Sequence, residues 1–234
     1  MSAGANGIFV GGQASQNASA VISTFSGGIS NSGTISAGAA GILVGSRSGF
    51  GTAVSTFAGG ISNSGKISAR GDGILVGGQA AGSNTPVIVS SSGGISNTGT
   101  ISAGGYGIAV SNVAVFADTQ AGGITNSGTI RARRAGIFVG GLADTAHGSV
   151  AASAFAGSVS NGGTISGSGI AIFVGGQAGA GESVTLSMFS GGIANSGTIA
   201  GSSAPVPAAR RPWRPWCDRD PPSSSAAGRH RAHR

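Results

Sequence analysis

One decapeptide motif recurs six times along this chain and constrains its fold more than any other feature. The motif reads Gly-Gly-Ile-Ser-Asn-Ser-Gly-Thr-Ile-Ser at residues 27–36 and returns with small changes. Its asparagines, at intervals of 29 to 35 residues, are Asn31, Asn63, Asn97, Asn126, Asn161 and Asn195. A repeat of this length is typical of solenoids, propellers and other arrays in which each unit packs on its neighbours. We therefore expect one repeat domain.

Each repeat has three segments. The motif supplies the first, Gly-Gly-Ile-Ser-Asn-Ser-Gly, and its end together with the next residue forms the second, Thr-Ile-Ser-Ala. A Gly-Ile-x-Val segment follows as the third, as at residues 41–44 and 73–76. Apolar and polar residues alternate in these segments with a period of two, which indicates β-strands. The segments are short, and Gly or Asn-Ser-Gly separates them, residues that tolerate the positive φ of tight corners. The pattern predicts an all-β protein, a parallel β-helix (β-solenoid) of about six coils.

Stacking of the coils about 4.8 Å apart would place equivalent residues in columns. The first inner column is Ile29, Ile61, Ile95, Ile124, Val159 and Ile193, and the second is Ile35, Ile67, Ile101, Ile130, Ile165 and Ile199. The third is Ile8, Ile42, Ile74, Ile108, Ile137 and Ile172. The six asparagines are expected at a corner, as a ladder in which each amide bonds to the next amide and to backbone. The alternative is that Asn only favours the turn.

An outer apolar column is expected on the Gly-Ile-x-Val strand. The side chains of its members should point outward, opposite to those of the neighbouring Ile and Val. They are Phe9, Leu43, Leu75, Phe138 and Phe173. An exposed apolar stripe calls for cover. We expect that the variable excursions, such as residues 46–58 and 177–190, add a fourth strand or flap over it. The alternative is a stripe that stays exposed. The excursions often end in Phe, namely Phe25, Phe57, Phe155 and Phe189.

The repeat pattern stops near residue 203. Residues 1–203 form the predicted repeat region, with units near 27–58, 59–92, 93–121, 122–156, 157–190 and 191–203. Residues 204–234, rich in Arg, Pro, Ser and Ala, are expected to be a disordered basic tail. A frameshift or truncation near residues 202–205 is the favoured explanation, because off-frame GC-rich coding DNA gives this composition. A genuine disordered tail is the alternative.

The net charge of +7 belongs mainly to this tail. The tail has seven Arg against two Asp, whereas the repeat region has six basic and four acidic residues. A nearly neutral repeat region gives no reason to expect specific binding of nucleic acid. Cys217, the only cysteine, lies in the tail, so neither a disulfide nor a thiolate metal site is expected in the repeats. No run approaches the length of a membrane-spanning helix, and no secretory signal is apparent.

The succession Ile-x-Asn-Ser-Gly-Thr-Ile and Gly-Ile-x-Val, over about residues 1–200, resembles the passenger repeats of bacterial autotransporters, adhesin-like proteins of type V secretion. The resemblance implies a right-handed parallel β-helix at the outer-membrane cell surface, with a structural or adhesive role. It also implies a host or surface glycan or protein as partner, and membrane anchorage through a C-terminal β-barrel. Neither the barrel nor a signal is present, so we expect a fragment of a longer secreted parent.

Two alternative functions remain open. Parallel β-helices include polysaccharide lyases and hydrolases, which need clustered carboxylates for calcium or acid–base chemistry. The acids Asp72, Asp118, Asp144 and Glu182 fall at different places in different coils, and His147 has no partner at ligand spacing. We therefore expect no enzyme: no catalytic residue, no cofactor and no metal site. The second alternative is an ice-binding solenoid. It is based on a face where the column Thr34, Thr100, Thr129, Thr164 and Thr198 stacks beside Ser36, Ser68, Ser102 and Ser166, a face that Lys66 and Arg131 interrupt.

Two interaction features remain. Arg70-Gly71-Asp72 spells a cell-attachment tripeptide, although the same turn reads Gly38-Ala39-Ala40 one coil earlier and the bland interpretation is an ordinary corner. The repeats begin at the last strand of a coil, the Gly-Ile-x-Val segment, and stop after the Thr-Ile segment of another coil. The predicted stack therefore has strand edges at both ends. Such edges are templates for pairing with another chain. We therefore expect end-to-end self-association.

Overall fold

The computed structural model describes residues 1–12, 20–46, 52–54, 56–79, 90–113, 121–143, 150–152, 154–179, 183–186 and 188–201. In these ranges every regular element is a β-strand and no helix occurs. The chain divides into two units, Met1–Ser203 and Ala204–Arg234, and the described residues all belong to the first. The predicted disordered tail, with Cys217, lies outside the described residues.

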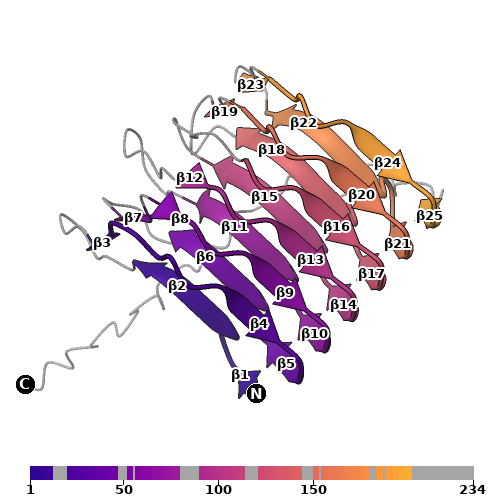
Figure 1. Cartoon of the computed structure of the whole chain (residues 1–234), viewed down its shortest axis with the longest axis horizontal. Coiled ribbons are helices and arrows are strands. Elements are labelled where there is room, and N and C mark those ends of the chain that lie inside the picture. Colours follow the sequence, from indigo (N-terminus) through magenta and orange to yellow (C-terminus); the bar gives the residue numbers. More distant parts are fainter. Residues whose placement is uncertain are drawn as a thin grey trace, which may run out of the picture. The chain divides into compact units, whose positions relative to one another are not determined.

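Three long sheets make up the described unit (Figure 1). The Asn sheet contains β4 (Ile29–Asn31), β9 (Ile61–Asn63), β13 (Ile95–Asn97), β16 (Ile124–Asn126), β20 (Val159–Asn161) and β24 (Ile193–Asn195). The Thr sheet contains β1 (Ser2–Ala3), β5 (Thr34–Ala37), β10 (Lys66–Ala69), β14 (Thr100–Ala103), β17 (Thr129–Ala132), β21 (Thr164–Gly167) and β25 (Thr198–Gly201). The Val sheet contains β2 (Ile8–Gly12), β6 (Ile42–Ser46), β11 (Ile74–Gln79), β15 (Ile108–Val113), β18 (Ile137–Ala143) and β22 (Ile172–Ala178).

Equivalent strands of successive repeats lie side by side, parallel and in register. In the Thr sheet, for example, Ile67 pairs with Ile35 on one side and with Ile101 on the other. Figure 1 shows the same order along all three sheets, with each repeat adding one strand to each sheet. The prediction of an all-β parallel β-solenoid is confirmed. The handedness of its winding stays a prediction.

The predicted inner columns form the core. Along β10 the exposed and buried residues alternate, so that Ile67 and Ala69 point inward while Lys66 and Ser68 point outward. Ile101, Ile108 and their counterparts in neighbouring coils are fully buried, and all three predicted columns contribute to one cluster. Burying each Ile stabilises the fold by about 2 kcal/mol. Because a β-branched side chain packs well on a pleated sheet, the Ile repeats favour strands over any helix.

The middle strands of the Val sheet are buried on both faces. Ile42 and Val44 of β6 belong to the main core, whereas Leu43 between them joins a second apolar cluster with Leu75 and Phe138. The prediction of a covered outer column is confirmed for these three residues, of which Phe138 is 0% exposed. The alternative of a fully exposed stripe is wrong there. Strands that are buried on both faces have near-continuous apolar sequences, and the Ile-Leu-Val of these strands is an example.

The excursions contain short strands in their described parts. These form three parallel pairs: β3 (Ala20–Ile22) with β7 (Thr52–Val54), β8 (Thr56–Phe57) with β12 (Ser90–Ser91), and β19 (Val150–Ala152) with β23 (Val184–Leu186). The first and third pairs contact strands of the Val sheet, so the predicted fourth strand exists in these coils. The Phe side chains that end the excursions stack in the main core, Phe25 on Phe57 and Phe155 on Phe189, each with centroids 5.7 Å apart.

The predicted asparagine ladder is present from end to end. Each Asn side chain donates from Nδ2 to Oδ1 of the Asn one coil later, at 2.7 Å in all five steps from Asn31 to Asn195. Each Nδ2 also donates to the carbonyl oxygen two residues on, as Asn97 does to Gly99 at 3.3 Å. The four middle side chains, which are at most 1% exposed, thereby keep their amides paired. The alternative that Asn serves only the turn is wrong.

Candidate recognition surface

The tripeptide Arg70-Gly71-Asp72 lies at the corner between the Thr sheet and the Val sheet. Backbone bonds hold this corner between its neighbours: Gly71 N donates to Ala39 O at 3.0 Å, and Gly105 N donates to Gly71 O at 2.9 Å. The segment therefore takes the same place as Gly38-Ala39-Ala40, as the sequence predicts. It is a stacked corner, not a projecting loop.

The carboxylate of Asp72 has a structural partner in the next coil. Its Oδ1 accepts a hydrogen bond from the backbone N–H of Tyr106 at 2.7 Å. Asn6 does the same two positions before β2, where its Oδ1 accepts from Ala40 N at 3.1 Å. An ionised acceptor makes the stronger bond of the two. Asp72 thus bridges two coils, and recognition of the tripeptide by a receptor stays a prediction.

Tyr106 connects this corner to the second apolar cluster. Its ring stacks on Phe138 with centroids 4.7 Å apart, and Arg134 Cζ lies over the ring, 5.4 Å from its centroid. The hydroxyl donates to Oε1 of Gln177 at 3.3 Å. Burial raises the pKa of the Tyr106 hydroxyl above its ordinary value; nearby Arg134 opposes that shift and Asp72 adds to it.

Five basic side chains gather along the Thr sheet and this corner, and we call them the basic corner. They are Lys66, Arg70, Arg131, Arg133 and Arg134, and all five are exposed. Arg70 and Arg133 occupy one column with Gly104 between them, so their backbones are two coils, about 10 Å, apart. Among the described residues Asp72 is the only acid. Like charges clustered at this spacing attract an anionic partner.

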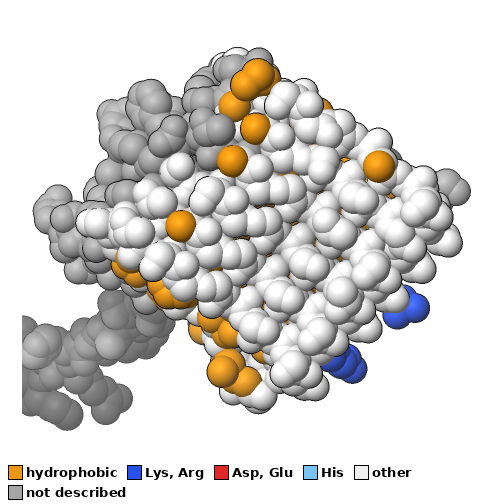
Figure 2. Space-filling model, viewed as in Figure 1, with side chains coloured by type: hydrophobic (Ala, Val, Ile, Leu, Met, Phe, Trp, Pro, Cys, Tyr) orange, Lys and Arg blue, Asp and Glu red, His pale blue; other side chains and the backbone are white. Residues whose placement is uncertain are grey.

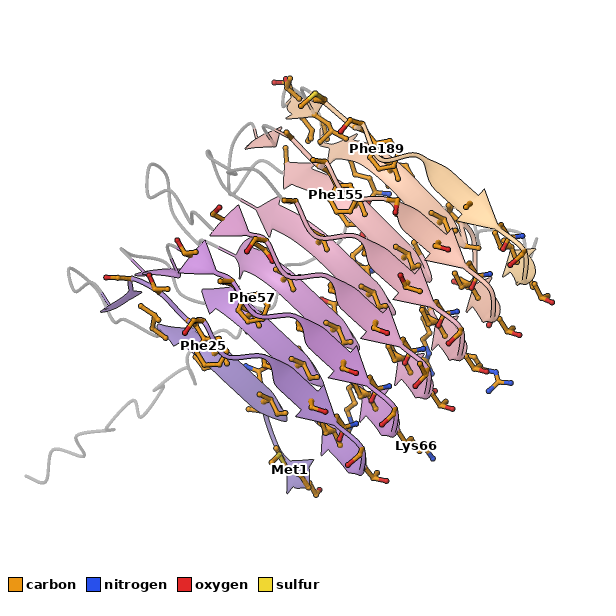
Figure 3. The ribbon with its side chains drawn as sticks, in the orientation of Figure 1. Met1, Phe25, Phe57, Lys66, Phe155 and Phe189 are labelled. Atoms are coloured by element: carbon orange, nitrogen blue, oxygen red, sulfur yellow. The ribbon has the colours of Figure 1, made fainter. Side chains whose placement is uncertain are left out.

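Hydroxyl side chains fill the rest of the Thr sheet's outer face. The predicted column stacks in register, with Lys66 between Thr34 and Thr100, and with Arg131 between Ser102 and Ser166. Figure 3 shows the Lys66 side chain projecting from β10 away from the stack. In Figure 2 the Lys and Arg side chains in view lie at the lower right margin, where Figure 1 places the strands of the Thr sheet. This surface suits a polar partner.

The residues considered for catalysis are only partly described. Asp118, Asp144, Glu182 and His147 lie outside the described residues, so their predicted scatter is untested. In the part of the chain that the structure does describe, no group of three His, Cys, Asp or Glu residues could hold a metal ion. Nor does any helix in that part have the length and apolar character needed to cross a membrane.

Sequence reasoning missed the bond between Asp72 and Tyr106. The available signal was positional: Asn6 and Asp72 both stand directly before the Gly that precedes a strand of the Val sheet, where other coils have Ala, Tyr or Ile. A short side chain with an oxygen two bonds from Cβ can reach the next coil's N–H from that position.

A comparison with protein-family models, curated proteins and solved structures finds no match to this chain in any of the three.

Proposed function

We propose that this chain is a structural and adhesive module of a bacterial cell surface, which binds rather than catalyses. The observation that carries the proposal is the basic corner, five exposed cations held at fixed spacing on a stack of parallel strands. A partner that matches it is an acidic surface polymer, such as a sulfated or carboxylated glycan. The resemblance to autotransporter passenger repeats supports the same role and the location outside the cell.

The rigidity of the corner supports recognition. Each basic residue lies on, or next to, a strand whose backbone is bonded to coils on both sides, as Arg70 N is to Ala37 O and Arg133 N to Ala103 O, both at 3.1 Å. The backbones are therefore ordered before binding, and only the long side chains lose freedom when a ligand arrives. A repeating polyanion could contact cations on alternate coils at once.

Substitutions taken from the protein's own columns test this proposal. Lys66→Thr and Arg131→Ser restore the residues found at the same positions in neighbouring coils, and Arg70→Gly and Arg133→Gly do the same at the corner. The measurement is equilibrium binding to immobilised heparin, with neutral dextran as the reference. All proteins carry Ser in place of the seven tail Arg, because that tail would otherwise dominate the signal.

The fourfold variant is expected to bind heparin roughly tenfold more weakly, and its affinity to depend less on salt. Ser62→Ala, an exposed position on the Asn sheet, is the matched control and should bind like the parent. Equal affinity of the fourfold variant and the parent would remove the basic corner as a recognition surface. Calcium-dependent release of products from an acidic polysaccharide would favour the enzyme alternative instead.

A further inference from the structure

The five cations of the basic corner form two rows, and one uncharged coil lies between the rows. Lys66 and Arg70 lie on β10 and directly after it, and they make up the first row. Arg131, Arg133 and Arg134 lie on β17 and directly after it, and they make up the second. β14 runs between these strands and pairs with both (Figure 1). The two rows are therefore two coils, about 10 Å, apart.

The middle coil presents hydroxyl groups where its neighbours present cations. Thr100 is the neighbour of Lys66 in the sheet, and its side chain is half-buried. Ser102 is the neighbour of Arg131 and is half-buried as well. None of residues 90–113, the described part of this coil, is charged. A neutral, hydroxyl-bearing surface thus separates the two basic rows.

Packing keeps this gap open at the corner. Gly104 stands between Arg70 and Arg133 in one column, because its backbone bonds to the coil before it as that of Arg133 does. A Cβ on Gly104 would lie 2.1 Å from the carbonyl oxygen of Arg70, so a side chain there would displace the backbone of the first row. The separation of the two arginines is therefore part of how the coils stack.

The two rows attract anions separately. At physiological ionic strength the Debye length is about 8 Å, so an anion over one row is largely screened from the other. Asp72 lies beside the first row, but its Oδ1 already accepts from Tyr106 N and the cations outnumber it. An anion over the middle coil would lose water without gaining a cation, which costs free energy. A neutral group there can exchange hydrogen bonds with Thr100 and Ser102.

We propose that the basic corner binds an acidic polysaccharide in which a charged sugar alternates with a neutral one. This inference rests on the adhesive function proposed above. A sugar in an extended chain is about as long as the strand spacing of about 4.8 Å, so successive sugars of a chain that crosses the strands fall on successive coils. Two charged sugars then reach the two rows, and the neutral sugar between them lies over Thr100 and Ser102.

The charge spacing of the ligand tests this inference. The probes are fragments of hyaluronan, which has a carboxylate on alternate sugars, and of polymannuronate, which has one on every sugar. Fragments with equal numbers of carboxylates are compared by isothermal titration calorimetry at physiological salt, again with Ser in place of the seven tail Arg. Simple charge attraction favours the denser fragment. The proposed spacing instead predicts that hyaluronan binds about fivefold more tightly.

An exchange of Ser102 and Arg131 moves one cation into the middle coil without changing the net charge. The two residues are neighbours in one outer column, which also contains Ser68 and Ser166. In Ser102→Arg with Arg131→Ser, cations lie on three successive coils, so the preference for hyaluronan should disappear. Ser36→Arg with Arg131→Ser is the matched control, because it has the same charge and leaves the middle coil neutral. It should keep the preference, and both variants should keep the parent's circular dichroism spectrum.

Three results would overturn the alternating ligand. They are equal or tighter binding of polymannuronate by the parent, a preference for hyaluronan that persists in the exchange variant, and tighter binding of single-stranded DNA with the same number of charges. The last result would assign the surface to nucleic acid.

The fourfold variant described above separates the two proposals. If it binds both fragments as the parent does, the adhesive function of the basic corner fails, and this inference fails with it. If it loses affinity for both fragments and the parent shows no preference, only the alternating ligand fails.

Discussion

Asn63 donates from Nδ2 to Oδ1 of Asn97 at 2.7 Å, and both side chains are 0% exposed. The bond joins residues that lie 34 positions apart in sequence and one coil apart in space. Because each amide needs its neighbour for both donor and acceptor, no single Asn in the middle of the ladder can be lost without leaving polar groups unpaired. The ladder therefore ties the register of every coil to the next.

Asn97→Ala should destabilise the protein strongly. It removes two ladder bonds and the bond to Gly99 O. One N–H of the Asn63 amide and the side-chain oxygen of Asn126 then lose their ladder partners in the interior. We expect a loss of about 2–4 kcal/mol in unfolding free energy, measured by urea denaturation. Asn31→Ala is the matched control, because it makes only one ladder bond and should cost about 1 kcal/mol. Equal losses would mean that the ladder adds little stability.

Gly45→Ala should be more harmful than its small size suggests. Gly45 has a φ of 137°, and a Cβ there would lie 1.6 Å from the carbonyl oxygen of Gly77 in the next coil. Backbone strain and displacement of a neighbouring strand together should cost about 2–4 kcal/mol. Gly169→Ala, with nothing within 4 Å, should melt like the unchanged protein. A normal melting temperature for Gly45→Ala would show that the Val sheet can adjust at this position.

The columns could be predicted because the sequence repeats, whereas features that occur in a single coil could not. Ile35 and Asn31 each have five counterparts, so a face or a role assigned to one position is checked by the others. The bond that Tyr106 N donates to Asp72 has one equivalent, from Ala40 N to Asn6, and a position with two such residues gives a far weaker signal than a full column. The excursions differ in length and composition, so their short strands, such as β19, could be expected only in general terms. The basic corner arises from the geometry that places Arg70 and Arg133 in one column.

Asp72 should tolerate Asn but not Ala. Asn keeps an Oδ1 that can accept from Tyr106 N, as Asn6 does from Ala40 N, whereas Ala leaves that N–H without its partner. We expect Asp72→Ala to lose about 1–2 kcal/mol in urea denaturation and Asp72→Asn to lose much less. The pair also separates structure from adhesion. If Arg70-Gly71-Asp72 attaches cells, Asp72→Asn should abolish attachment although the fold is intact; unchanged attachment would leave Asp72 a purely structural residue.

Tyr106 should make the fold sensitive to alkali. It is the only tyrosine, so absorbance at the phenolate band follows this residue alone. Burial raises the pKa of its hydroxyl in the folded chain above the ordinary value of about 10. The neutral form is thus favoured by folding, and its stabilising contribution is complete below the unfolded pKa and is lost as the pH rises through the folded one. A titration of the native protein should show a midpoint above that of the urea-unfolded chain, with a melting temperature that falls over the same interval. Tyr106→Phe keeps the ring on Phe138 and should flatten that fall. A native midpoint at or below the unfolded one would contradict the buried position of the hydroxyl.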